Sequence, residues 1–104
     1  MNIDLHNLES QAVALLQKAC SPDGIWASPD DQENYRRVWG RDSMIAGIAG
    51  LLANDDQVIE GLRSSILTLA KYQHPRGMIP SNVLPDENNP QVSYGSLAGR
   101  VDAN

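Results

Sequence analysis

The sequence predicts an all-α fold built from helical hairpins. Apolar residues recur at three- and four-residue spacing in three segments, which is the period of helices with one face toward a core. Only two or three residues join the second segment to the third, as in an antiparallel helical hairpin. With 104 residues, the chain has room for one domain at most.

The first predicted helix covers residues 4–19, with Asp4 as a candidate N-cap. Its apolar positions are Leu5, Leu8, Ala12, Leu15, Leu16 and Ala19. Turn residues at 21–24 end it. Residues 24–39 show no helical period, and we expect a loop there with short extended pieces, including residues 24–27.

The second and third helices are expected at residues 42–53 and 56–73. In the second helix, large apolar side chains form one stripe, which consists of Met44, Ile45, Ile48, Leu51 and Leu52. Small residues on its other side indicate that another backbone comes close there. From residue 74 to residue 104, four prolines and three glycines interrupt the chain, and neither helical period nor clean strand alternation appears. We expect this segment to be irregular, and long irregular segments are often functional.

Composition excludes several functions. The net charge of −5 argues against nucleic acid and anionic membrane as main partners, because both favour an excess of Lys and Arg. No apolar run is long enough to cross a bilayer, and no signal peptide is visible. A single cysteine, Cys20, permits no internal disulfide, which fits a cytoplasmic protein. One cysteine and two distant histidines give no metal-site spacing, so we expect neither metal nor cofactor.

Trp39, Arg41 and Asp42 form the strongest candidate site, just before the second helix. Asp42 at a helix start can cap the backbone N–H groups and interact with the helix dipole. An Asp–Arg pair beside an indole can also hold a sugar, because the carboxylate accepts from hydroxyls, the guanidinium donates and the ring packs on C–H groups. The sequence allows both interpretations at once.

Two further residues have a structural and a functional interpretation. His74 follows the third helix, where it can interact with the helix dipole or donate to a substrate from the following loop. Asp102 is either a solvated carboxylate or a general acid that protonates a glycosidic oxygen. Arg100 nearby would lower the pKa of Asp102 if the side chains met, which argues against the acid role.

Three strings in order resemble glucoamylase-like glycoside hydrolases, including neutral invertases and glycogen-debranching-type α-glucosidases. They are YRRVWGRDS at 35–43, GMIPS at 77–81, and Tyr94-Gly95 followed by GRVDA at 99–103. The resemblance implies an (α/α)6 barrel that hydrolyses with inversion of configuration, using an acid and a base whose carboxyl groups lie roughly 6.5–9.5 Å apart. By the same resemblance, Arg41, Asp42 and Trp39 would bind the sugar, and Asp102 would be the acid.

The chain departs from this family in length. A barrel of twelve helices needs roughly 300 residues, and the catalytic base has no counterpart here. We therefore expect an N-terminal fragment of an inverting glycoside hydrolase that acts on the terminal sugar of an α-glucoside or sucrose-like substrate, inactive alone. Helix faces left without neighbours would lead it to self-associate.

Two alternatives remain. The chain could be a small non-catalytic helical module for interaction or oligomerisation, in which Asp42 is only a cap. A barrel of this kind could also belong to a phosphorylase, an epimerase or a lyase, because fold does not determine chemistry.

Overall fold

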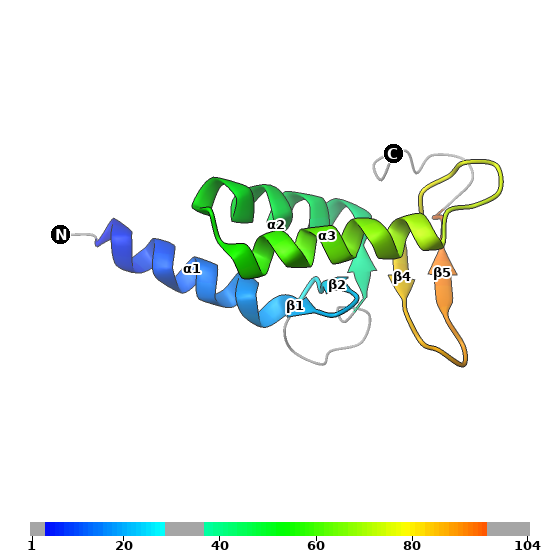
Figure 1. The fold of residues 1–104 in the computed structure, drawn as a ribbon, viewed down its shortest axis with the longest axis horizontal. Helices are drawn as coiled ribbons and strands as arrows, with labels where there is room; N and C mark the ends of the chain where they lie inside the picture. Colours follow the sequence, from blue (N-terminus) through cyan, green and yellow to red (C-terminus); the bar gives the residue numbers. More distant parts are fainter. Residues whose placement is uncertain (1–3, 29–36, 96–104) are drawn as a thin grey trace.

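The structure, a computed structural model, describes residues 4–28 and 37–95. In these ranges the chain forms a small α+β domain with three helices and two small antiparallel sheets (Figure 1). The prediction of an all-α fold, and of part of an (α/α)6 barrel, is therefore wrong. Every helix is connected to a strand or packs against one, and these strands determine where the candidate site lies.

The three predicted helices are present. They are α1 (Leu5–Ala19), α2 (Gly40–Ala53) and α3 (Asp56–Lys71). Asp4 caps α1 as predicted, since its Oδ1 accepts from the backbone N–H of Asn7 at 3.0 Å. Asp55 caps α3 in the same way, through the N–H of Val58 at 2.9 Å. Helix α2 begins two residues earlier than predicted and α3 ends two residues earlier.

Five short strands form the two sheets. Strands β1 (Cys20–Ser21) and β2 (Gly24–Ile25) make a hairpin, and β2 lies in the piece predicted to be extended. Strands β3 (Val38–Trp39), β4 (Asn82–Leu84) and β5 (Gln91–Ser93) form the second sheet in that order. The segment predicted to be irregular thus contains two strands. Strands of two or three residues are too short for alternation to be visible, and the pairing joins distant residues such as Val38 and Val83.

Helices α2 and α3 form the predicted antiparallel hairpin and lie side by side (Figure 1). Asn54 makes the turn in the left-handed conformation, at φ 54°, which Asn tolerates better than most residues. The small-residue side of α2 faces α3: Gly47 and Gly50 are buried, and a Cβ on Gly47 would overlap the side chain of Leu62. Most of the large apolar stripe of α2 consequently points outward, with Ile45, Ile48, Leu51 and Leu52 exposed, whereas Met44 packs against the core.

Helix α3 carries both apolar clusters of the core. The first cluster joins Ala19, Ile25 and Val58, and the second joins Val38, Leu69 and Val83. Helix α1 contacts the α2–α3 hairpin toward the C-terminal end of α1. The N-terminal half of α1 extends away from the rest of the described chain (Figure 1). Large apolar side chains therefore remain exposed on all three helices, namely Leu5, Leu8, Leu15, Ile45, Ile48, Leu51, Leu52, Ile66 and Leu67.

A hydrogen-bonded contact fixes the β1–β2 hairpin on α3. The buried Ser65 Oγ accepts from the backbone N–H of Ile25 at 2.8 Å and donates to the carbonyl of Gly61 at 2.9 Å. Gly24 has φ +143°, and a Cβ there would lie 2.6 Å from Ser65 Oγ. The hairpin approaches this closely because Gly24 has no side chain.

Replacement of Gly47 by Ala tests the α2–α3 contact. At an exposed helical site, Gly→Ala stabilises by about 1 kcal/mol. Here the new methyl group meets Leu62 in a packed interface, so we expect a loss of about 1–3 kcal/mol in the free energy of unfolding, measured by urea titration. The control is Ala49→Gly on the exposed side of the same helix, which should lose only about 0.5–1 kcal/mol. A more stable Gly47→Ala variant would contradict the contact.

Candidate functional site

The predicted site residues Trp39, Arg41 and Asp42 lie where β3 runs directly into α2. Trp39 pairs with Asn82 in the sheet and is also the N-cap residue of α2. The backbone N–H of Gly40 donates to the carbonyl of Ser81 at 2.9 Å, and Ser43 Oγ donates to the carbonyl of Trp39 at 2.7 Å. No loop separates strand from helix, so two rigid elements position this site.

Asp42 is not the capping residue of α2. The N-cap position belongs to Trp39, whose side chain makes no capping hydrogen bond, and Asp42 lies within the first turn. Its side chain is 47% exposed, and Oδ1 lies 3.9 Å from Nε of Arg41, which is 59% exposed. An exposed pair at this distance adds at most about 1 kcal/mol to stability. The structure thus places an exposed carboxylate and an exposed guanidinium near each other in the first turn of α2, at the positive end of a helix dipole.

Sequence reasoning missed a polar cluster that continues from this site across the second sheet. Arg37 donates from Nη1 to Oδ1 of Asn82 at 3.1 Å and from Nη2 to Oε1 of Gln91 at 2.7 Å. Asn82 is the pairing partner of Trp39. Because these residues are 45 and 54 positions apart from Arg37, only the strand register brings them together. The arginine-rich string around residue 37 was the one local signal.

His74 lines a cavity to which the other predicted site residues do not contribute. A cavity of about 410 Å³ is lined by His74, Arg76, Met78 and Tyr94. The His74 ring meets Tyr94 edge-on, with centroids 5.2 Å apart, and its Nδ1 accepts from the N–H of Arg76 at 3.0 Å. Nδ1 is thus used within its own turn, which leaves Nε2 as the nitrogen that could meet a ligand. Neither Arg41 nor Asp42 lines this cavity.

Asp102 and Arg100, the remaining site residues considered from the sequence, lie outside the described residues. Among the residues that are described, no group of three His, Cys, Asp or Glu side chains could hold a metal ion. None of the helices in the described ranges is both long enough and apolar enough to span a membrane.

A small apolar cleft adjoins the start of α2. It measures about 180 Å³ and lies between the first turn of α2, the C-terminal half of α3 and Ile79. Its lining residues are Gly40, Met44, Ile66, Leu69, Ala70 and Ile79. The cleft could take one apolar group, but Asp42 does not line it, and it offers few polar atoms for recognition.

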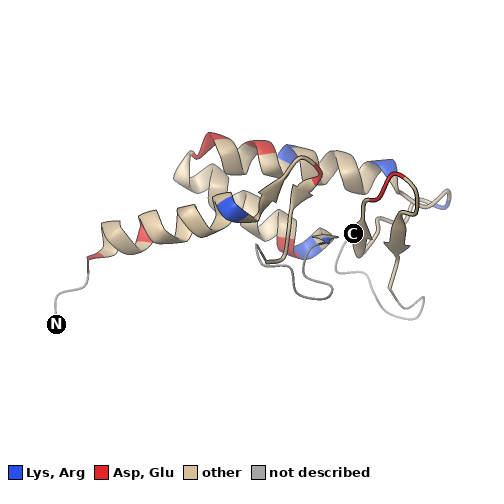
Figure 2. Ribbon diagram, turned by 90° about the horizontal axis from the view of Figure 1, so that it is seen from below, with Lys and Arg blue, Asp and Glu red and all other residues tan. Residues whose placement is uncertain are grey.

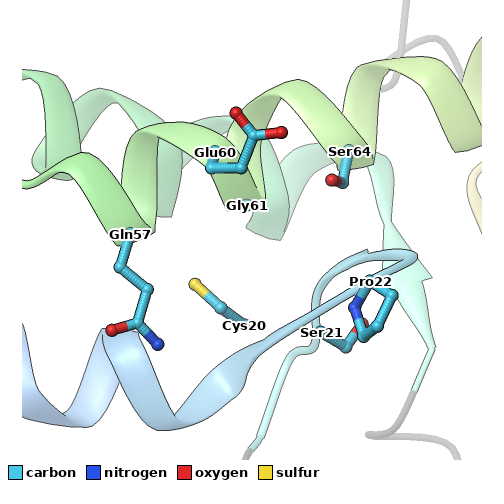
Figure 3. A pocket seen from close by; sticks show the side chains of 7 residues that line it. All are labelled: Cys20, Ser21, Pro22, Gln57, Glu60, Gly61 and Ser64. Carbon is cyan, nitrogen blue, oxygen red and sulfur yellow. The ribbon is translucent and has the colours of Figure 1, made fainter.

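A wider groove separates the β1–β2 hairpin from α3. It measures about 570 Å³, with Glu60 and Ser64 on the α3 wall and Pro22 on the hairpin wall (Figure 3). The Cys20 thiol lies between the walls and donates to the carbonyl of Leu16, with Sγ 3.3 Å from the oxygen. Burial, and secondly the Asp55 carboxylate, raises the pKa of Cys20 above its ordinary value of 9.0. A raised pKa makes this thiol a poorer nucleophile at neutral pH, which argues against cysteine chemistry in the groove.

With the geometry established, we compared the chain with protein families, curated proteins and solved structures, and none of the three comparisons found a match.

The raised pKa of Cys20 gives a pH dependence. Above pH 9.0 the unfolded chain loses the thiol proton while the folded chain keeps it, so folding stability falls as pH rises through that window. We expect the difference in unfolding free energy between the wild type and Cys20→Ala to shrink as pH rises from neutrality past this value, in urea titrations. The alanine variant serves as the control for all other titrating groups. A difference that grows with pH would contradict the assignment.

Proposed function

We propose that this chain supplies the sugar-binding part of an inverting glycoside hydrolase acting on the terminal sugar of an α-glucoside or sucrose-like substrate. The observation that carries the proposal is the exposed Asp42 carboxylate, which lies near the Arg41 guanidinium in the helical turn that follows Trp39 and is not used as the helix cap. A capping role would have explained Asp42 without any ligand. With the N-cap position assigned to Trp39, capping no longer explains Asp42, and the structural role that remains is the interaction of an acidic first-turn side chain with the helix dipole.

The arrangement suits vicinal hydroxyl groups. A carboxylate accepts two hydrogen bonds from neighbouring hydroxyls while a guanidinium donates to a third oxygen, and charged groups make the stronger hydrogen bonds. The indole of Trp39, only partly buried, offers an apolar surface for the C–H groups of a pyranose. Since β3 and α2 hold the backbone of all three residues, little ordering is needed on binding.

Hydrolysis itself needs an acid and a base. In this proposal Asp102 is the general acid, by the resemblance of its string to the acid segment of invertase-like enzymes. No residue of this chain matches the base of that family. The proposal therefore assigns sugar binding to this chain and expects no turnover from it alone.

The second candidate function is a non-catalytic interaction module. The exposed apolar side chains of α2 favour it, with Ile45 62%, Ile48 56% and Leu52 85% exposed. In that case Arg41 and Asp42 would be a surface ion pair without a ligand. Sugar binding requires the Asp42 carboxylate, whereas an interaction module does not. A sugar-binding measurement on an Asp42 variant therefore distinguishes the two functions.

Replacement of Asp42 by Asn tests the proposed function. A monosaccharide has about twelve non-hydrogen atoms, which at about 0.3 kcal/mol each gives a Kd of roughly 1–3 mM. We expect glucose, maltose or sucrose to change the tryptophan fluorescence with such an affinity, and Asp42→Asn to weaken binding at least tenfold. The fold should be unaffected, because Asp42 is exposed and is not the cap.

The matched control is Asp56→Asn, which changes an exposed aspartate in the first turn of α3. It should bind sugar as the wild type does. Absence of sugar binding by the wild type, or equal binding by Asp42→Asn, would leave the interaction module as the better account.

A further inference from the structure

The cavity in the turn after α3 is lined by two basic side chains and no carboxylate. It measures about 410 Å³, and the described residues that line it are His74, Arg76, Met78 and Tyr94. The Tyr94 hydroxyl donates to the carbonyl of Tyr72 at 2.7 Å, so its proton is already used. The side-chain donors left to meet a ligand are therefore the imidazole of His74 and the guanidinium of Arg76.

His74 presents one N–H group to this cavity. Its Nδ1 accepts from the backbone N–H of Arg76 at 3.0 Å, so Nδ1 carries no proton and the neutral ring holds its proton on Nε2. The ring also meets Tyr94 edge-on, with centroids 5.2 Å apart. These two contacts hold the ring, and Nε2–H is the group that can donate to a ligand.

The guanidinium of Arg76 is available to a ligand as well. It is exposed, and it makes no ion pair or hydrogen bond with any residue that the structure describes. Arg63, by comparison, lies 3.7 Å from Glu60. Arg76 is also the only charged residue between Lys71 and Asp86 in the sequence (Figure 2). Its positive charge therefore has no neighbour along this segment that would neutralise it.

The backbone that carries both donors is closed by its own hydrogen bonds. The N–H of His74 donates to the carbonyl of Met78 at 2.9 Å, and the N–H of Gly77 donates to the carbonyl of His74 at 2.7 Å. Nε2 of Gln73 adds a bond to the carbonyl of Gly77 at 2.8 Å. Gly77 adopts φ 97°, a conformation that residues with a side chain rarely take. A ligand thus meets a turn that is already formed, so binding requires little ordering of the backbone.

The C-terminal end of α3 lies next to this turn, and its dipole disfavours an anion. Its last carbonyls are already bonded, because the N–H of Tyr72 donates to the carbonyls of Thr68 and Ala70 and the Tyr94 hydroxyl donates to that of Tyr72. Lys71 adds a positive charge in the last turn. Both features oppose the dipole, so the charge of the turn itself favours an anionic ligand.

The number of donors indicates which anion fits. A guanidinium donates through two parallel N–H groups to two oxygens of a carboxylate or a phosphate, and Nε2–H of His74 adds a third donor. A carboxylate has only two oxygens, whereas a phosphate monoester has three terminal oxygens that accept. The cavity volume is within the range of small-molecule sites, so there is room for an organic group beyond the phosphate.

We propose that this cavity binds a small phosphate monoester, with Arg76 donating to two phosphate oxygens and Nε2–H of His74 donating to the third. The organic group of the ester packs on Met78 and Tyr94. The site goes beyond the sugar-binding proposal and does not depend on it, because neither Arg41 nor Asp42 lines this cavity.

The first test is a titration of the whole chain with phenyl phosphate, followed by proton–nitrogen NMR spectra. The probe has about eleven non-hydrogen atoms, so we expect a Kd on the order of a few millimolar, with the largest shifts at the amides of Arg76, Gly77 and Tyr94. Arg76→Gln should weaken binding at least tenfold without changing the fold, because the guanidinium contacts no described residue. The matched control is Arg63→Gln, which changes an exposed arginine of α3 and should bind as the wild type does.

Two further probes test the class of ligand. Inorganic phosphate lacks the organic group and should bind several-fold more weakly than phenyl phosphate. Benzoate has two oxygens in place of three and should bind at least tenfold more weakly. Absence of saturable shifts at tens of millimolar phenyl phosphate, the largest shifts at another part of the chain, or unchanged binding by Arg76→Gln would overturn the site. Benzoate binding as tight as that of phenyl phosphate would overturn the choice of a phosphate monoester.

Discussion

The close approach of the β1–β2 hairpin to α3 determines where the other elements can lie. Ser65 bonds to Ile25 on one side and to Gly61 on the other, and Gly24 permits the contact because a side chain there would overlap Ser65. Thr68 adds a hydrogen bond to the carbonyl of Asp23. A buried backbone N–H without a partner costs about 1–3 kcal/mol. The β1–β2 hairpin can therefore pack on α3 without this cost only because Ser65 accepts from the N–H of Ile25. Both apolar clusters of the core then form on α3.

The packing of the core on α3 also determines where the candidate site lies. Val38 and Val83 pack with Leu69 of α3, which fixes β3 against the helix, and β3 continues into α2 without a loop. Asp42 therefore lies in the first turn of a helix that follows directly from β3. His74, in contrast, lies in the turn after α3 and bonds mainly within that turn.

The sequence predicted the helices and the helical hairpin because their signals are local: the apolar period, the capping residue Asp4, and the short connection between the second and third helices. It could not predict the sheets, since Val38 and Val83 pair across 45 residues and each strand is too short to show a period. For the same reason it missed the contacts of Arg37 with Asn82 and Gln91. Trp39, Arg41 and Asp42 were found together because they are adjacent in the chain. The capping interpretation of Asp42 failed because pairing of Trp39 with Asn82 moved the helix start to Gly40.

Amide hydrogen exchange at Ile25, followed by NMR, tests most directly whether α3 and the hairpin form one unit. If Ser65 holds this amide as the structure shows, Ile25 should exchange only when the whole domain unfolds, with the same opening free energy as the amide of the buried residue Leu69 in the interior of α3. Exchange of Ile25 at the rate of an open loop, while the α3 amides stay protected, would contradict the account. The hairpin would then be a loosely attached segment, and α3 could not position the strands that hold the site.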